Sequence, residues 1–396
     1  MQELLYLVHR IPYPPNKGDK IRSYHILKHL SQNHKIHLGT FIDDEKDWEY
    51  VEELKKICSE TCFVKLDPQV SRIRSLSGIA TNQPLTLPYY QDKGLQKWVN
   101  NLLNTRHIKN ILVFSSAMAQ YVKEPNSTHC VIDFVDVDSD KWKQYSKKKP
   151  WPLSWLYQRE SNLLLEYERK IARIFDASTF VSEAESKFFK NLAPEAEKKV
   201  TYFNNGVNAE YFSPEKVNTN PYKSNADILV FTGAMDYWAN VDAVEWFTHN
   251  IFTLIRSQLP SVEFYIVGSK PTAKVTALSS IPGVTVTGSV EDIRPYIVHA
   301  TLAVVPLRIA RGIQNKVLEA MAMAKTVVAS PQAAEGIKAV HGQELFVENN
   351  EHKFVDRIVT QIKSEGNMKV GNAARERILE DYSWKKILNQ VDKLLL

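Results

Sequence analysis

The feature that most constrains the fold is an alternation of short apolar runs with amphipathic helical segments. Seven apolar runs lie in the first half of the chain: "LLYLVH", "KIHLGTF", "CFVKL", "NILVFS", "CVIDFV", "ASTFVS" and "KVTYFNN". Six lie in the second half: "DILVFTGAM", "EFYIVGS", "VTVTGSV", "TLAVVPL", "TVVAS" and "ELFVE". Helical patterns occur between them at 20–31, 45–59, 163–174, 243–258 and 315–324. Uniformly apolar strands that alternate with helices predict parallel sheets covered on both faces, and therefore an α/β fold.

The length of the chain predicts two domains, because 396 residues exceed the size at which one core keeps growing. A polar stretch with two prolines separates the two series of strands. We therefore expect a first domain over 1–212, a linker over 213–226 and a second domain over 227–382. An amphipathic helix over 383–396 is expected to return to the first domain. Open parallel sheets bind ligands beyond their carboxyl ends, so two such domains predict a central cleft.

Composition excludes several classes of protein. The net charge of +5 suits anionic small molecules or a lipid surface, and it falls short of the basic stripe of a nucleic-acid binder. The three cysteines lack metal-ligand spacing, which favours a reduced compartment and no metal site. The first apolar run breaks at His9, too early for a signal peptide or a membrane span. We expect a cytoplasmic protein.

The stretch "RGIQNKVLEAMAMAKTVVAS" has the chemistry of a diphosphate site. Free amides at a helix N-terminus bind anions, and a glycine allows the tight turn that precedes them. The residues expected to face the donor are Arg308, Arg311, Gly312, Ile313, Gln314, Asn315 and Lys316. Glu319, one turn further along, can accept hydrogen bonds from a ribose. The alternative is an ordinary helix start with solvated charges.

The segment "NKVLEAMAMAKTVVAS" resembles the signature of glycosyltransferases of the family 4 type, also described as glycosyl transferases group 1. The resemblance implies the GT-B fold, with two Rossmann-like domains whose parallel sheets face a central cleft, and a retaining reaction. Family members carry two glutamates eight positions apart. Glu319 matches the second, which binds ribose, whereas Arg311 stands where the first would hold the donor sugar.

The segment "VFTGAMDYWANVDAVEWF" also resembles the family, with Gly233 after its strand. Family members often place an arginine and a lysine on the diphosphate where this chain has Ala234 and Ala239. We expect Arg308, Arg311 and Lys316 to supply the missing charge, because an uncompensated diphosphate in a partly dry cleft would be costly.

Further segments extend the resemblance. "FYIVGS" and "VTVTGSVEDIRPYIVHATLAVVPL" imply backbone contacts to the nucleobase near Gly268, Gly288 and Val290. "PYPPNKGDKIRSYH" is similar to sugar transferases of bacterial exopolysaccharide systems, and its Gly18 would face the donor phosphates.

Two aspartates are candidate catalytic residues. Asp19 is either a helix cap or a carboxylate in the cleft. Asp136 follows "CVIDFV", at a strand end where many family members have a histidine, and the alternative is a solvated loop position. Asp138 and Asp140 complete a cluster similar to the metal-binding pair of the other glycosyltransferase fold, but the tandem α/β pattern argues against that fold.

The segment "DKWKQYSKKKPWPLSWLYQRE" combines five lysines with three tryptophans. Two interpretations stand side by side. Such a mixture suits an anionic membrane surface, where lipid-linked acceptors reside, and it also suits a solvated loop whose tryptophans enter the core.

The resemblance implies a retaining, metal-independent hexosyltransferase that uses a nucleoside diphosphate sugar (UDP- or GDP-sugar) and no cofactor. Its acceptor would be a glycan or lipid-linked molecule in exopolysaccharide or cell-surface polysaccharide synthesis. Location would be cytoplasmic, with peripheral contact at the inner membrane left open. The substitutions at Ala234, Ala239 and Arg311 keep an alternative open, a non-catalytic sugar-nucleotide or glycan-binding component of a polysaccharide assembly complex.

Overall fold

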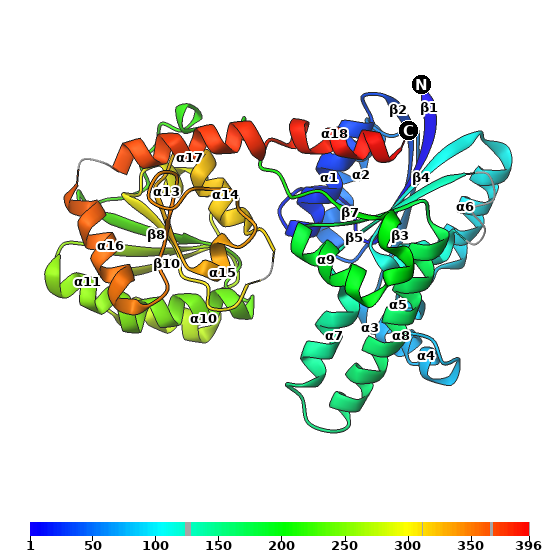
Figure 1. Ribbon diagram of the computed structural model, residues 1–396, viewed down its shortest axis with the longest axis horizontal. Coiled ribbons are helices and arrows are strands. Elements are labelled where there is room, and N and C mark those ends of the chain that lie inside the picture. Colours follow the sequence, from blue (N-terminus) through cyan, green and yellow to red (C-terminus); the bar gives the residue numbers. More distant parts are fainter. Residues whose placement is uncertain (123–127, 311, 365–366, 396) are drawn as a thin grey trace. The chain divides into compact units, whose positions relative to one another are not determined.

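The computed structural model describes residues 1–122, 128–310, 312–364 and 367–395. It consists of two compact units (Figure 1). Unit 1 comprises Met1–Asn204 and Leu388–Leu396, and unit 2 comprises Asn205–Ile387. The predicted linker falls within unit 2, where Ser213 and Tyr222 are buried. The Tyr222 hydroxyl donates to the carbonyl of Tyr296 at 2.5 Å, which explains why this polar stretch packs on its own unit.

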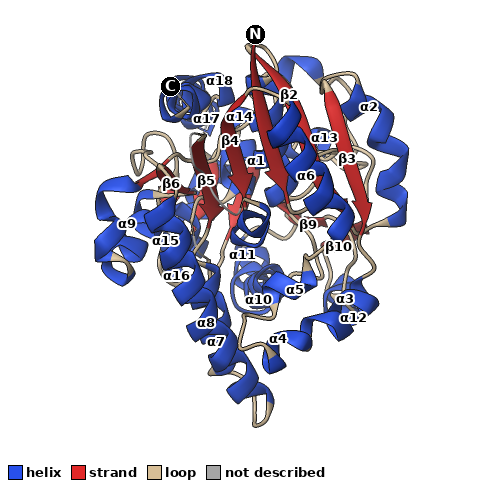
Figure 2. Ribbon diagram, turned by 90° about the vertical axis from the view of Figure 1, so that its right-hand side faces the viewer, coloured by secondary structure: helices blue, strands red, loops and turns tan. Residues whose placement is uncertain are grey.

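Unit 1 contains a seven-stranded, all-parallel sheet in the order β3-β2-β1-β4-β5-β6-β7. Its strands are β1 (Gln2–Val8), β2 (His34–Ile42), β3 (Glu60–Lys65), β4 (Ile108–Phe114), β5 (His129–Val135), β6 (Ala177–Phe180) and β7 (Val200–Tyr202). All seven predicted runs form strands. Most of their residues are buried because helices lie on both faces of the sheet (Figure 2).

The helices of unit 1 are unequal in length. The longer ones are α1 (Gly18–Leu30), α6 (Lys93–Thr105), α7 (Asp138–Ser146), α8 (Leu153–Ile174) and α9 (Glu183–Leu192). Shorter turns are η1 (Glu45–Tyr50), α2 (Val51–Lys55), α3 (Pro68–Ser75), α4 (Ser77–Ala80), α5 (Thr86–Tyr89), η2 (Ser116–Tyr121) and η3 (Pro194–Lys199). The predicted helix over 45–59 is confirmed in part, since η1 forms its first half as a 3₁₀ turn and α2 follows as an α-helix that ends at Lys55. Helix α8 begins ten residues earlier than predicted, and with α7 it forms a hairpin that projects beyond the sheet (Figure 1).

Unit 2 contains a six-stranded, all-parallel sheet in the order β10-β9-β8-β11-β12-β13. Its strands are β8 (Ile228–Thr232), β9 (Glu263–Val267), β10 (Val284–Gly288), β11 (Leu302–Val305), β12 (Val327–Ala329) and β13 (Phe346–Val347). All six predicted runs form strands here too. The predicted α/β class with two Rossmann-like domains is confirmed.

The helices of unit 2 include one continuous helical stretch made of α10 (Trp238–Trp246), a π-helical turn η5 (Phe247–Phe252) and α11 (Thr253–Gln258). The others are η4 (Pro214–Lys216), α12 (Ala273–Ala277), η6 (Leu278–Ser280), α13 (Arg294–Val298), α14 (Asn315–Ala322), α15 (Pro331–Ala334), α16 (Glu351–Lys363) and α17 (Asn367–Asp381). In the described part of the chain, no helix has the length and apolarity needed to span a bilayer.

The last helix, α18 (Trp384–Leu394), is shared between the units. Its second half belongs to unit 1, where Asp392 lies 2.8 Å from Nε2 of His29 and the side chain of Asn110 donates to the carbonyl of Leu395 at 2.9 Å. Its first half belongs to unit 2, where the ring of Trp384 packs so closely on Gly206 that a Cβ there would lie 2.8 Å from it. The apolar face of the helix is buried throughout.

Candidate functional site

In unit 2 the candidate site lies where the strand order reverses, between β8 and β11. Ligands of open α/β sheets bind beyond the strand ends at such a reversal. Gly233 follows β8, and the loop that follows β11 leads into α14. The residues predicted to bind the sugar donor therefore follow the ends of two neighbouring strands, β8 and β11.

Lys316 is the central charge of this site. Its Nζ donates to Oδ1 of Asn240 at 2.6 Å and lies 4.1 Å from the centre of the Phe231 ring. A Cβ at Gly233 would be 2.9 Å from Nζ and 2.8 Å from Nδ2 of Asn240. Glycine is therefore required at position 233, because any side chain would displace the lysine or its partner. Asn240 also donates to the carbonyl of Ala234, so Lys316 lies beside the loop in which Ala234 stands.

The hydrogen-bond partner of Lys316 is a neutral amide, although the carboxylate of Glu319 is near enough to affect its pKa. No ion pair involves Lys316 among the residues that the structure describes. Burial lowers the pKa of Lys316 to about 7, although the carboxylate of Glu319 opposes this shift. Burial likewise raises the pKa of Glu319 to about 7, against the effect of Lys316. A buried lysine whose pKa is lowered in this way would be stabilised in its charged form by an anionic partner.

The turn into α14 offers further polar groups. Gly312 has φ of +63°, a conformation that favours glycine. Gln314 precedes the helix and donates from its side chain to the carbonyl of Gly312 at 3.0 Å. Oδ1 of Asn315 is buried without a hydrogen-bond partner in the described part of the chain. The side chain of Ile313 is buried in the unit 2 core, so only its backbone can face a ligand.

Arg308 and Lys316 are held on different faces of α10. Both Nε and Nη2 of Arg308 donate to the carboxylate of Asp242, with Nε 2.9 Å from Oδ2. Asn240 and Asp242 are two positions apart on the helix and so point in different directions. Arg308 and Lys316 thus have different partners in this structure, and their convergence on a diphosphate stays a prediction. Arg311, the third expected cation, lies outside the described residues.

The predicted nucleobase contacts lie at the ends of β9 and β10. A Cβ at Gly268 would be only 1.7 Å from the carbonyl oxygen of Gly233, so the two strand ends touch through their backbones. The amide of Gly268 donates to the carbonyl of Gly288 at 3.3 Å. Val290 packs its side chain on the core. Gly233, Gly268 and Gly288 thus line one continuous edge.

Sequence reasoning missed an aromatic group near Glu319. Tyr211 lies in the stretch next to the predicted linker, and the guanidinium of Arg294 stacks 3.8 Å from its ring centre. Arg294 also binds Asp292 at 2.7 Å. Burial raises the pKa of the Tyr211 phenol, and the charges of Asp292 and Glu319 raise it further. The exposed ring of Tyr211 thus lies within electrostatic range of the Glu319 carboxylate.

In unit 1, a second charged cluster lies at the reversal between β1 and β4. Arg10 donates to Asp19 at 2.7 Å and lies 2.8 Å from Asp43, and His9 lies 3.5 Å from Asp19. Burial alone would raise the pKa of Asp19, but the hydrogen bond and charge of His9 and the charge of Arg10 hold it well below its usual range. Asp19 is in the first turn of α1, not at its cap, which is Lys17. Asp19 is therefore not the cap of α1, and its carboxylate is paired beside the end of β1, while the predicted role in a cleft stays a prediction.

Gly18 has no structural need to be glycine. It begins α1 with ordinary backbone angles, and a Cβ built there would meet nothing within 4 Å. The space above it is open, as close approach of a ligand would require.

Asp136 follows a distorted strand end. Val135 has φ of +71°, which is strained for a β-branched residue. The buried carboxylate of Asp133 stabilises this bulge by accepting the amide of Val135 at 3.2 Å, and it also pairs with Arg22 at 2.6 Å. The carboxylate of Asp136 lies 2.9 Å from Nζ of Lys141, so it is engaged within its own turn.

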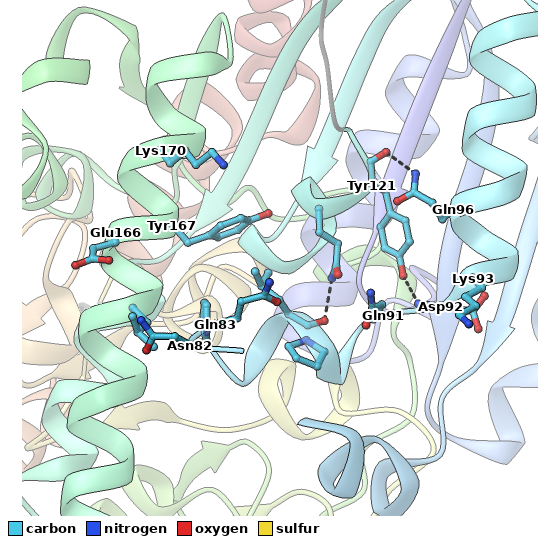
Figure 3. A pocket seen from close by; sticks show the side chains of 15 residues that line it. Asn82, Gln83, Gln91, Asp92, Lys93, Gln96, Tyr121, Glu166, Tyr167 and Lys170 are labelled. Carbon is cyan, nitrogen blue, oxygen red and sulfur yellow. Dashed lines mark hydrogen bonds between the residues drawn. The ribbon is translucent and has the colours of Figure 1, made fainter. Parts of the chain in front are cut away.

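A cavity of about 600 Å³ lies on one face of the unit 1 sheet (Figure 3). Amide side chains, two tyrosines and charged residues line it: Asn82, Gln83, Gln91, Asp92, Lys93, Gln96, Gln120, Tyr121, Glu166, Tyr167 and Lys170. The described part of the connection between β4 and β5 is only the short turn η2, so no full helix fills the space between α6 and α8. Sequence reasoning missed this cavity. The only signal in the sequence is the high content of Asn and Gln over residues 82–120, which indicates a polar surface there.

The described residues contain no cluster of three or more His, Cys, Asp or Glu side chains able to hold a metal ion. The cysteines Cys58, Cys62 and Cys130 are unpaired.

Comparison with known proteins places this geometry in context. Residues 226–364 match the family model described as glycosyl transferases group 1. A protein of Klebsiella pneumoniae, described as an uncharacterized 44.6 kDa protein in cps region, is 21% identical over 409 residues, which cover 99% of this chain and 100% of that protein.

Two solved structures resemble the whole chain. Sucrose-phosphate synthase from Thermosynechococcus elongatus has a TM-score of 0.72 at 16% identity and covers 100% of this chain and 98% of its own. HepE from Anabaena, solved in complex with UDP, has a TM-score of 0.69 at 14% identity, covering 100% and 99%. The fold of the chain is GT-B.

Proposed function

Because residues 226–364 match the family model described as glycosyl transferases group 1 and the chain has the GT-B fold, we propose that it transfers a sugar from a nucleoside diphosphate donor to a glycan or lipid-linked acceptor. The observation that carries this proposal is Lys316, a buried amine at the strand reversal of unit 2 whose hydrogen-bond partner is the neutral amide oxygen of Asn240 and for which no ion pair is found among the described residues. A diphosphate would complete its charge. HepE, which shares the fold, was solved with UDP and with UDP-glucose, and this supports a UDP-sugar, with a GDP-sugar as the other expectation.

The proposed chemistry is stabilisation of the leaving diphosphate. Lys316 would donate from one side, and the backbone amides of the turn from Gly312 to Asn315 would donate from the end of α14. Glu319 would accept from the ribose while Tyr211 packs against the nucleoside. We expect these groups to suffice without a metal ion or cofactor.

In unit 1, we propose that Asp19 orients a sugar hydroxyl and that Asp136 lies near the transferred sugar. Because Asp19 is held ionised by Arg10 and His9, it suits hydrogen-bond acceptance better than proton abstraction. Retention of configuration and a hexose donor are implied by the family resemblance. The acceptor belongs to exopolysaccharide or cell-surface polysaccharide synthesis, for which the relative from a cps region is support.

One observation favours a second candidate, a non-catalytic component that binds sugar nucleotides or glycans. Both candidate carboxylates of unit 1 are engaged in ion pairs, Asp19 with Arg10 and Asp136 with Lys141. A transferase must leave at least one such group available when both substrates are bound.

Thermal unfolding with a panel of nucleoside diphosphates and their sugars tests donor binding. A ligand at a hundred times its dissociation constant stabilises by about 2.7 kcal/mol. Glu319→Ala should weaken the binding of the nucleotide that stabilises the wild type by about 1.5 to 3 kcal/mol, as expected for a lost charge-assisted hydrogen bond. Slow release of nucleoside diphosphate from the bound sugar donor would support a transferase. Tight binding with no release, with or without acceptor extracts, would favour the binding component.

A further inference from the structure

The positive charge of the chain is concentrated in two segments of unit 1, residues 68–91 and 141–159. Together they contain eight cations and no Asp or Glu: Arg72, Arg74, Lys141, Lys143, Lys147, Lys148, Lys149 and Arg159. The whole chain has 50 lysines and arginines against 45 Asp and Glu, so the remaining residues carry 42 against 45. The chain is therefore at +5 only because of these segments, and everything else is at −3.

The same two segments expose large apolar side chains. Trp151 is 80% exposed and Trp155 55% exposed, both near the tip of the α7–α8 hairpin, and Ile73 on α3 is 72% exposed. The other exposed members are Val70, Leu76, Ile79, Tyr145 and Leu153. Clustered exposed apolar groups of this size mark an interaction surface on a folded protein.

The two segments lie side by side. Nη2 of Arg159 on α8 donates to the carbonyl of Gly78 on α4 at 2.8 Å. The next residue, Glu160, is buried and accepts from the amides of Leu85 and Thr86. Trp155 is one helical turn before Arg159, so it lies on the same side of α8 as α4. Figures 1 and 2 both show α4 next to the α7–α8 hairpin. We call these exposed residues of 68–79 and 143–155 the hairpin surface.

The hairpin is firmly built. The rings of Trp142 and Tyr157 pack with their centres 5.1 Å apart, and Ser146 donates to Gln158 at 3.2 Å. Deeper in, Glu168 accepts from both the amide and the hydroxyl of Ser139. The expectation that the tryptophans enter the core is not met: Trp142 is half-buried and packs on Tyr157 of the hairpin, and Trp151 and Trp155 are exposed. Trp151 and Trp155 are presented outward by a rigid scaffold.

We propose that the hairpin surface docks the protein on a membrane that contains anionic phospholipid. Tryptophan side chains favour the headgroup region, and lysines next to them are attracted to anionic headgroups while their stems remain in apolar surroundings. A surface that combines both and lacks carboxylates is complementary to such a membrane. This proposal goes beyond sugar transfer and does not depend on it. If transfer is correct, docking would bring unit 1 to lipid-linked acceptors.

Binding to lipid vesicles tests the proposal. Wild-type protein should sediment with vesicles of phosphatidylcholine that contain 30% phosphatidylglycerol. Each lysine near the surface is worth roughly a fivefold change, so the triple variant Lys143→Gln, Lys147→Gln, Lys149→Gln should bind on the order of a hundredfold more weakly. The matched control changes three exposed lysines of unit 2 in the same way: Lys216→Gln, Lys223→Gln and Lys338→Gln. It should bind as wild type does.

Tryptophan fluorescence gives a second, charge-independent readout. Vesicles with brominated acyl chains should quench the wild-type protein, and the double variant Trp151→Phe, Trp155→Phe should lose most of that quenching. An unchanged circular dichroism spectrum and an unchanged thermal unfolding midpoint of every variant show that folding is intact.

Three results would overturn the proposal. The first is failure of the wild type to bind anionic vesicles. The second is equal binding by the hairpin variant and its unit 2 control. The third is that the hairpin variants instead abolish self-association or binding to a nucleic acid while vesicles have no effect. A protein that binds vesicles but no nucleotide would refute the proposed function and leave this inference intact.

Discussion

The two units use the same topological position for charges in opposite ways. At the reversal in unit 1, Arg10 is paired with both Asp19 and Asp43, so the cluster is neutralised internally. At the reversal in unit 2, Lys316 donates to the neutral amide oxygen of Asn240 and forms no ion pair within the described residues, although the carboxylate of Glu319 is near enough to affect its pKa. A compensated cluster suits a neutral ligand such as a sugar, whereas an uncompensated cation suits an anion such as a diphosphate. Under the proposed function, the difference indicates that unit 2 holds the diphosphate and that unit 1 holds neutral sugar groups.

The same contrast continues below the surface. Unit 1 buries a complete ion pair, Arg22 with Asp133, beneath its site, and the guanidinium also donates to the carbonyl of Phe203. In unit 2 the bidentate pair of Arg308 with Asp242 is at the surface. The Arg22–Asp133 pair is therefore part of the core of unit 1, whereas the Arg308–Asp242 pair of unit 2 is partly exposed to solvent.

The largest effect should come from breaking the buried pair. Asp133→Ala leaves Arg22 as an uncompensated buried charge and removes the acceptor that stabilises the strained Val135. We expect unit 1 to lose about 3 to 5 kcal/mol of its free energy of unfolding. Hydrogen exchange followed peptide by peptide would show the loss in unit 1 and little change in unit 2.

A matched variant sharpens this result. Asp242→Ala breaks the exposed pair in unit 2 and should cost only about 0.2 to 1 kcal/mol. Comparable losses in the two variants would mean that the pairs of the two units do not differ as described.

The next effect concerns ligand affinity. Lys316→Met should weaken binding of the nucleoside diphosphate by about 1.5 to 3 kcal/mol while leaving the nucleoside nearly unaffected, because only the phosphates contact the cation. Arg308→Ala should cost less, since its guanidinium is engaged by Asp242. Calorimetry with nucleoside, monophosphate and diphosphate measures this, with Lys338→Met as the control. Equal losses for all three ligands would remove Lys316 from the phosphate site.

Much of the fold could be predicted from the sequence because its signals are local. Each of the thirteen strands falls on an apolar run, and the shortness of the runs, with helical patterns between them, identifies them as strands. The start of α8 could not be predicted in this way. Its first turns expose Trp155 and Leu153, so they lack the apolar stripe facing a core that marks a helix in sequence.

The site was predicted only as far as motifs reach. Gly233, Lys316 and Glu319 were identified from family-like segments, and the structure brings the first two together. Tyr211 was missed because it is more than a hundred residues before Glu319, and only folding brings the two close. The pairing of Asp19 with His9 and Arg10 was also missed, since it depends on where β1 ends relative to the first turn of α1. Such relations are tertiary and leave no spacing signal.

A smaller effect follows from the pKa of Lys316. Because burial lowers that pKa to about 7, the free protein at pH 8 holds Lys316 mostly neutral, and a bound diphosphate should restore its proton. Binding at pH 8 should therefore take up about 0.9 proton, and affinity should fall roughly tenfold per pH unit above pH 7. Glu319, with its pKa raised to about 7, is already ionised at pH 8 and adds little. Calorimetry in buffers of different ionisation enthalpy measures the uptake. Lys316→Arg, which stays charged, should show none, and uptake that persists in this variant would assign the proton to another group.

The smallest effect should come from Asp19, and it bears most directly on the difference between the units. If the unit 1 cluster is complete in itself and does not contact the diphosphate, Asp19→Asn should change nucleoside diphosphate affinity by less than about 0.5 kcal/mol, because Arg10 keeps its partner Asp43 at 2.8 Å. The same variant should weaken the sugar donor relative to the diphosphate alone, by about 0.5 to 1.5 kcal/mol for one lost hydrogen bond to a sugar hydroxyl. The measurement is the ratio of the two affinities in wild type and variant. A loss that is the same for diphosphate and sugar donor, and exceeds about 1.4 kcal/mol, would mean that removing one carboxylate has disturbed a phosphate contact. Unit 1 would then share the anion with Lys316, and the assignment of neutral and charged ligand parts to separate units would fail.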